Sequence, residues 1–216
     1  MKITSLSAQV RNPDRVNVAI DGVYRLSLTV AQVVDLGIKV SSEIDEELLA
    51  SLEAESTFGK LYARTLEYCL MRPHSAREVR DYLYRKTRTT RYKQRRTGEI
   101  KEREGVSQLM ADRVYDRLVE KGYIDDEKFA QFWVENRNQT KGASRRKLQA
   151  ELQVKGVDNG VIETVLSESG RNDQAELMKV IAKKKGKYPD SQKLLSYLAR
   201  QGFRYDDIKS ALEESD

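Results

Sequence analysis

The strongest chemical signal in the sequence is a dense basic run between residues 85 and 96. Seven of these twelve residues are arginine or lysine, and none is acidic. Positive charges this close together repel one another unless an anion relieves the repulsion. The run therefore predicts a mobile basic arm or hairpin that contacts a polyanion, and a solvated loop without a partner is the alternative. Its basic members are Arg85, Lys86, Arg88, Arg91, Lys93, Arg95 and Arg96.

Further basic residues lie at the ends of helices that the sequence predicts. Residues 145–147, an Arg-Arg-Lys run, open one helix. Positive charge there opposes the helix dipole, so a bound phosphate or carboxylate explains these residues better than capping does. Arg77 and Arg80 hold comparable places upstream. Residues 183–185 are three lysines that end another helix, where a favourable dipole interaction is an equal alternative to ligand binding.

Residues that could catalyse a reaction are sparse. The single histidine, His74, lies in a predicted turn between helices, and no Ser–His–Asp or Cys–His set assembles around it with any specificity. The phosphate-binding P-loop and the H-E-x-x-H zinc motif are both absent. Acidic clusters at 45–47 and 125–127 fall at predicted helix starts, which favours capping over metal binding. We expect no enzymatic activity, no cofactor and no metal site.

The composition agrees with a helical protein that binds a polyanion. The 216 residues are 39% hydrophobic and 34% charged, with a net charge of +5 and a sequence pI of about 9.1. Hydrophobic residues recur throughout, which argues against a disordered polyelectrolyte. The lone Cys69 excludes an intramolecular disulfide and a cysteine-based zinc site. No apolar run reaches 18 residues, and no secretory leader is recognisable, so we expect a soluble cytoplasmic protein.

The N-terminal 56 residues predict a small β-hairpin module. Alternating apolar residues in 16–20 and 24–28 flank Asp21-Gly22, and this turn pair tolerates the positive φ that tight hairpins need. Ahead of them, residues 3–10 predict a short irregular strand. Thr29 is expected to cap a short helix, and Asp45 a second one that carries three leucines.

The rest of the chain is helical in pattern and contains internal repeats. Two copies of one pattern lie 46 residues apart. Each copy predicts a helix, a glycine that ends it and a second helix. The matching residues are Leu148, Leu152, Gly156, Ile162 and Leu166 in one copy and Leu194, Leu198, Gly202, Ile208 and Leu212 in the other.

A diverged third copy lies upstream, and a further helix precedes each pair. The two helices of the upstream copy are separated by the basic segment, roughly residues 86–104. Phe129, Phe132 and Trp133 could stack on bases, but their spacing favours the repeat core. We predict a mainly α protein in which three tandem three-helix repeats form an elongated curved body behind the N-terminal module. The predicted boundaries are 1–56 for that module and 57–124, 125–170 and 171–216 for the repeats.

The order and spacing of several segments resemble the RecX family. The resemblance rests on Arg72-Pro73-His74-Ser75-Ala76-Arg77-Glu78-Val79, on Gly122-Tyr123-Ile124-Asp125-Asp126-Glu127-Lys128-Phe129-Ala130 and on Trp133, Arg137 and Lys141-Gly142. It continues through Arg145-Arg146-Lys147-Leu148 and Lys155-Gly156-Val157, and more loosely through residues 197–203. The first repeat departs from its sister copies, because Thr87 stands where they have glycine.

The resemblance implies a non-enzymatic regulator. RecX-like proteins associate with RecA filaments on single-stranded DNA, lie in the filament groove and suppress ATP hydrolysis and strand exchange. They also bind DNA weakly by themselves. The expected partners are therefore the RecA filament and single-stranded DNA, with no membrane, and the expected state is a monomer.

Two other functions remain open from the sequence. The basic segment alone would support a general helical DNA- or RNA-binding protein, and the repeats alone would support a protein-interaction scaffold. The residues expected to contact RecA or DNA are Arg77, Arg80, Arg85, Lys86, Arg88, Arg91, Lys93, Arg95, Arg96, Arg137, Lys141, Arg145, Arg146, Lys147, Lys155, Lys183, Lys184 and Lys185.

Overall fold

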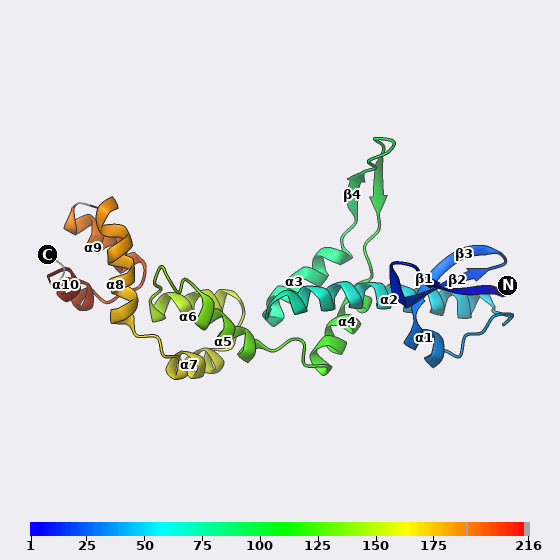
Figure 1. Cartoon of the computed structure of the whole chain (residues 1–216), viewed down its shortest axis with the longest axis horizontal. Helices are drawn as coiled ribbons and strands as arrows, with labels where there is room; N and C mark the ends of the chain where they lie inside the picture. The colour runs from blue at the N-terminus through cyan, green and yellow to red at the C-terminus, as the bar shows by residue number, and fades with distance from the viewer. Residues whose placement is uncertain (189, 214–216) are drawn as a thin grey trace. The chain divides into compact units, whose positions relative to one another are not determined.

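The computed structural model describes residues 1–188 and 190–213, and its helices and strands are labelled in Figure 1. The contacts divide the chain into two compact units. Unit 1 comprises Met1–Leu70 and Tyr82–Lys121, and unit 2 comprises Met71–Asp81 and the chain from Gly122 onward. The fold class is confirmed, since the protein is mainly helical with a small antiparallel sheet at its N-terminus. The predicted domain boundaries stay predictions, and the last three residues of the third predicted repeat lie outside the described part.

Unit 1 begins with a three-stranded antiparallel sheet in the order β1-β2-β3. The predicted hairpin is confirmed, and its turn residues Asp21 and Gly22 have φ values of 49° and 83°. The alternating apolar side chains of β2 and β3 point to one face, where Val18 and Leu28 are fully buried. The strands are β1 (Ile3–Gln9), β2 (Asn12–Ile20) and β3 (Val23–Thr29).

Two helices cover the buried face of this sheet. Thr29 forms a capping box with Gln32 at the start of α1 (Val30–Asp35), as its position predicts. Asp45 accepts a hydrogen bond from the amide of Leu48 at the start of α2 (Glu46–Met71). The sequence predicted two helices in that region, separated near residue 57, and the structure corrects this to one continuous helix of 26 residues.

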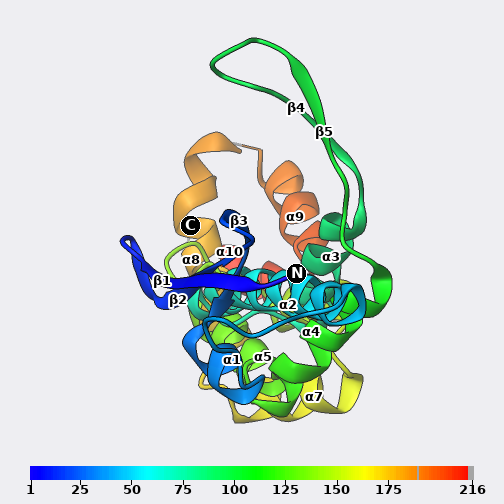
Figure 2. The same ribbon diagram turned by 90° about the vertical axis from the view of Figure 1, so that its right-hand side faces the viewer.

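The first repeat is completed by α3 (Ala76–Thr87) and α4 (Gln108–Glu120). The basic segment between them is a second hairpin of β4 (Thr90–Lys93) and β5 (Ile100–Arg103). Figures 1 and 2 show this hairpin projecting away from α2 and α4. A side chain at Gly105 would lie only 2.0 Å from the carbonyl oxygen of Thr87, so glycine lets the two ends of the insertion come close.

Unit 2 contains the second repeat, α5 (Asp126–Asn136), α6 (Arg145–Val154) and α7 (Asn159–Glu168). Its core confirms the predicted leucine stripe, because Leu148 and Leu152 are buried against Phe129 and Ile162. Trp133 is half-buried and packs on the same cluster, which confirms the core interpretation for Phe129 and Trp133.

The third repeat follows as α8 (Asp173–Lys184), the short 3-10 helix η1 (Lys185–Lys187), α9 (Ser191–Arg200) and α10 (Tyr205–Glu213). The repeat offset is confirmed in space, because Leu194, Leu198 and Ile208 are buried as their counterparts are. Gly156 and Gly202 both adopt positive φ, 80° and 91°, after the helices that they end.

Buried contacts join the second and third repeats. The Oγ of Ser144 donates to the carbonyl of Gln201, and the amide of Ala143 donates to the carboxylate of Glu176. Glu176 is only 3% exposed and also pairs with Lys179. Gly142 lies directly against the same helix, at a φ of 76°. The relative placement of these repeats therefore depends on buried polar pairs as well as on apolar packing.

Candidate functional site

The β4–β5 hairpin is an exposed basic feature of unit 1. Residues 85–104 contain nine basic and three acidic residues. Every residue of both strands is exposed. The three acidic residues follow the basic run in the sequence. One of them, Glu102 on β5, pairs with Arg91 on β4 and accepts a hydrogen bond of 2.6 Å from its guanidinium. Among the described residues, Arg91 is the only one of these nine basic residues with an ion pair, so most of the positive charge is not neutralised.

The two faces of the hairpin differ in chemistry. Directly opposite residues of an antiparallel pair share a face. Tyr92 therefore shares one face with Lys101, and the guanidinium of Arg103 lies 5.5 Å from the centre of the Tyr92 ring. The other face carries Arg91 and Lys93. Exposed aromatic and basic groups on one face can together contact bases and phosphates of a single strand.

The base of the hairpin forms a small basic pocket with α2 and α3. Arg85 and Lys86, which end α3, lie 5.9 Å and 4.6 Å from the centre of the Tyr82 ring. The pocket, of about 290 Å³, brings residues of the predicted basic run together with two basic residues of α2. Its basic lining residues are Lys60, Arg64, Arg85, Lys86, Arg88 and Arg103.

The basic residues at the start of α6 have different surroundings. The guanidinium of Arg145 donates to the carbonyl oxygen of Leu166 at 2.7 Å, and the Nζ of Lys147 donates to Gln201 at 2.6 Å. Arg146 is exposed and makes no side-chain hydrogen bond or ion pair within the described residues. These neutral internal acceptors orient Arg145 and Lys147 without cancelling their charge, so contact of residues 145–147 with an external anion stays a prediction.

Other predicted contact residues hold the first and second repeats together within unit 2. Arg77 donates to the carbonyl of Val154, and Lys155 donates to the carboxylate of Glu78 at 2.6 Å. Burial alone would raise the pKa of Glu78, but hydrogen bonds from Lys155, Arg72 and His74 lower that pKa to about 2. His74 therefore belongs to the hydrogen-bond network around Glu78, in agreement with the structural role expected for it. Arg80 is exposed on the same helix.

Arg137 forms a second such network on α5 and α6. Its guanidinium donates two hydrogen bonds, of 2.8 and 3.0 Å, to the carboxylate of Glu151. The indole of Trp133 donates to the same carboxylate at 3.0 Å. Burial favours a raised pKa for Glu151, but the bonds from Arg137 and Trp133 lower it. The arrangement fixes Arg137 over the Trp133 ring, and the two hydrogen bonds to Glu151 use two of the five N–H donors of a guanidinium.

The lysines of the second and third repeats converge on one place. Lys141, Lys147, Lys183 and Lys184 line a single pocket, although they are up to 43 positions apart. The pocket also contains Lys187, which the sequence did not mark as a candidate. Lys185 starts η1 next to it. The available signal was the basic run 183–187, which Gly186 interrupts, and only the three lysines before that glycine were predicted as contact residues.

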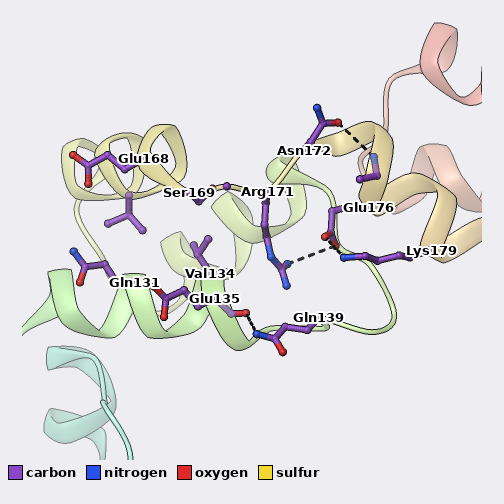
Figure 3. A pocket seen from close by; sticks show the side chains of 13 residues that line it. Gln131, Val134, Glu135, Gln139, Glu168, Ser169, Arg171, Asn172, Glu176 and Lys179 are labelled. Atoms are coloured by element: carbon purple, nitrogen blue, oxygen red, sulfur yellow. Dashed lines mark hydrogen bonds and ion pairs between the residues drawn. The ribbon is translucent and has the colours of Figure 1, made fainter.

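A larger pocket of about 820 Å³ lies between α5, α7 and α8. Figure 3 shows Arg171 pointing toward Glu176, with their charged atoms 3.8 Å apart, and Lys179 pairing with the same carboxylate. Gln131 and Glu168 line it farther out. Arg171 also donates to the carbonyl of Arg137, so this pocket is surrounded by groups that join the repeats.

Among residues 1–188 and 190–213, no group of three His, Cys, Asp or Glu side chains could hold a metal ion. Cys69 is buried, and burial raises the pKa of its thiol to about 11, so it is a poor nucleophile at neutral pH. Within the same residues, every helix is too short or too polar to traverse a lipid bilayer.

The chain is similar to RecX proteins along nearly its whole length. Residues 1–45 match the family model "Regulatory protein RecX N-terminal domain", and residues 125–166 match "RecX, second three-helix domain". The regulatory protein RecX of Bacillus licheniformis is 29% identical over 99% of this chain and 77% of its own length. The regulatory protein RecX of Clostridium botulinum is 28% identical over 99% of this chain and 96% of its own length.

Two solved structures share the fold. A crystal structure of regulatory protein RecX superposes with a TM-score of 0.70 at 18% identity and covers 98% of both chains. The crystal structure of RecX from Lactobacillus salivarius gives a TM-score of 0.52 at 19% identity, over 73% of this chain and 95% of that one. The helical repeats are therefore those of a known architecture.

Proposed function

The chain belongs to the RecX family of regulatory proteins, and we propose that it regulates the RecA recombinase by binding RecA filaments on single-stranded DNA. Bound in this way, it suppresses ATP hydrolysis and strand exchange in recombination, DNA repair and the SOS response. The observation that carries the proposal is the match to RecX proteins over 99% of the chain. A regulator of RecA acts where the chromosome lies, so the proposal places this protein in the cytoplasm.

The proposed mechanism is stoichiometric binding by a monomer. A ligand shifts the state of a filament only if it binds one state more tightly than another. The protein would hold RecA in a state that hydrolyses ATP poorly, or would occupy the surface that a second strand needs. The expected signature is inhibition that saturates at a fixed ratio of this protein to RecA.

We assign the exposed β4–β5 hairpin as one contact with the nucleoprotein filament. It carries the densest positive charge of unit 1, and Lys93, Arg95 and Arg96 have no internal ion pair among the described residues. Tyr92 and Arg103 add a stacked aromatic and guanidinium pair on one face. Such a surface suits phosphates and exposed bases better than an apolar protein partner.

Replacement of Lys93, Arg95 and Arg96 by serine tests this contact. Arg91 is left unchanged because it pairs with Glu102. Each lost phosphate contact lowers the slope of log affinity against log salt by about 0.7 on a single strand, so three contacts lower it by about 2. The measurement is binding to RecA filaments over a salt series.

A matched control replaces three exposed basic residues outside the hairpin, Arg11, Lys39 and Lys209, by serine. This control changes the net charge equally and should leave the slope near that of the wild type. Equal slopes for the two triple variants would remove the hairpin from the proposed interface.

General nucleic-acid binding is the second candidate function, and the basic hairpin favours it. Pull-down with RecA in the presence and absence of single-stranded DNA separates the two functions. The regulator should be retained by RecA filaments more strongly than by the bare strand. A general nucleic-acid-binding protein should be retained equally by both, and a protein scaffold would not need the strand.

A further inference from the structure

A pocket of about 310 Å³ in unit 2 is lined by the side chains of five lysines. It opens between the start of α6, the end of α8 and the end of α9. Tyr197 and Phe203 form part of its wall, and Asn138 and Gln201 add polar groups. This volume lies at the lower end of the range of small-ligand sites, about 300 to 1,000 Å³. The lysines are Lys141, Lys147, Lys183, Lys184 and Lys187.

The positive charge of this pocket is poorly compensated. No aspartate or glutamate lines it, and within the described residues none of its five lysines forms an ion pair with a carboxylate. Lys147 donates to the neutral amide of Gln201, and Lys184 lies 5.4 Å from the centre of the Tyr197 ring. These contacts orient the two side chains without cancelling their charge.

The nearest carboxylates are engaged elsewhere. Glu151, whose pKa Lys147 helps to lower, is held by Arg137 and Trp133. Glu176 is buried and accepts hydrogen bonds from the amide of Ala143 and from Lys179. Neither carboxylate lines the pocket, so an external anion is the remaining source of compensation.

The backbone that shapes one side of the pocket is fixed. The amides of Lys141 and Gly142 both donate to the carbonyl of Asn138, which itself has a φ of 50°. A Cβ at Gly142 would lie 2.3 Å from the carbonyl oxygen of Glu176 and 2.8 Å from a methyl carbon of Val180. The loop thus packs tightly on α8, and Lys141 projects from a backbone that these contacts hold in place.

We propose that this pocket binds phosphate groups of a nucleotide chain, such as the backbone of a single DNA strand. Lysine ammonium groups bind phosphate as point charges, and several of them around one pocket match adjacent phosphates of a chain. The proposal deepens the proposed function, because it assigns a strand-binding site in the second and third repeats that is separate from the hairpin.

The test replaces Lys183 and Lys187 by glutamine. Both side chains are exposed and unpaired within the described residues, so the fold should be retained, which a thermal melt verifies. The matched control replaces Lys39 and Lys121 by glutamine. These lysines are exposed, lie outside the pocket and form no ion pair within the described residues, and their replacement changes the net charge equally.

Binding is measured without RecA, by fluorescence anisotropy of a labelled oligothymidylate over a salt series. Loss of two phosphate contacts lowers the log–log slope by about 1.4, which corresponds to roughly 25-fold weaker binding at about 0.1 M salt. The control pair should weaken binding much less. If the pocket pair and the control pair have equal affinities and slopes for every phosphate probe, the proposal is wrong.

A second arm uses pyrophosphate and ATP, measured by calorimetry on the same variants. Loss of oligothymidylate binding in the pocket variant assigns the site to the strand backbone. Loss of pyrophosphate or ATP binding with the oligonucleotide unaffected supports the phosphate site but assigns it to a small ligand. Because RecA is absent, failure of the pocket is distinguishable from failure of the proposed regulation of RecA.

Discussion

Truncation of Leu152 to alanine should strongly destabilise the second repeat. Leu152 is fully buried against Phe129, Leu148 and Ile162. The change removes three carbon atoms, each worth about 0.8 kcal/mol of transfer free energy, and leaves a cavity. The expected loss of unfolding free energy is therefore about 3 to 5 kcal/mol.

Urea unfolding followed by tryptophan fluorescence is the matching assay. Trp133 is the only tryptophan and packs on the same cluster, so its emission reports on this repeat. With a urea dependence of about 1 to 3 kcal/mol per molar, a loss of 3 kcal/mol lowers the midpoint by roughly 1 to 3 M. The control is Val154→Ala on the same helix, where the side chain is 70% exposed and the expected change is below about 0.5 kcal/mol. Equal midpoints for the two variants would refute the assignment of the leucine stripe to the core.

Two further predictions concern the contacts between repeats. The pKa of Glu78 is lowered from 4.5 to about 2, so its network contributes up to about 3 kcal/mol to the free energy of unfolding above pH 5. This contribution is lost as the pH falls toward 2. Glu78→Gln should be less stable than the wild type at pH 7 and should lose less stability on acidification. If the unfolding free energies of the two proteins fall equally with pH, the network does not act as described. Gly142→Ala should lower the melting temperature, because positive φ costs about 1 to 2 kcal/mol and the new Cβ meets the carbonyl of Glu176 at 2.3 Å. The control Gly170→Ala has open space around it, so comparable melting of the two alanine variants would contradict the close approach.

The features that the sequence predicts well depend on short-range chemistry. Asp21-Gly22 needs only its own backbone preference to form the hairpin turn, and Thr29 needs only Gln32 three residues later. The glycine-ended helix pairs of the second and third repeats recur at a fixed offset, so one assignment of helices and core residues applies to both repeats. These features are confirmed because tertiary contacts reinforce the local preference.

The continuous α2 helix shows where local signals were insufficient. Ser56 and Thr57 are weak helix formers, and they lie at the predicted boundary between the N-terminal module and the first repeat. In the structure the Oγ of Ser56 donates to the carbonyl of Ser27 at 2.8 Å and accepts from the amide of the same residue. The sheet therefore satisfies Ser56, and the helix continues through it.

The candidate binding residues were the hardest part to predict. The acceptors of Arg145 and Arg77 are backbone carbonyls 21 and 77 positions away, and no side-chain pattern reveals them. These arginines also act within the fold, so their replacement would confuse a loss of structure with a loss of binding. Arg146→Glu is the cleaner test of the α6 surface, because Arg146 is exposed and has no side-chain partner within the described residues.

The most direct test of the central claim is the ATPase activity of RecA on single-stranded DNA while the wild-type protein is titrated in. Under stoichiometric regulation, hydrolysis should fall and then level off at a fixed ratio of this protein to RecA. An unchanged rate at molar excess over RecA, under salt conditions where the filament is stable, would contradict the proposed regulation.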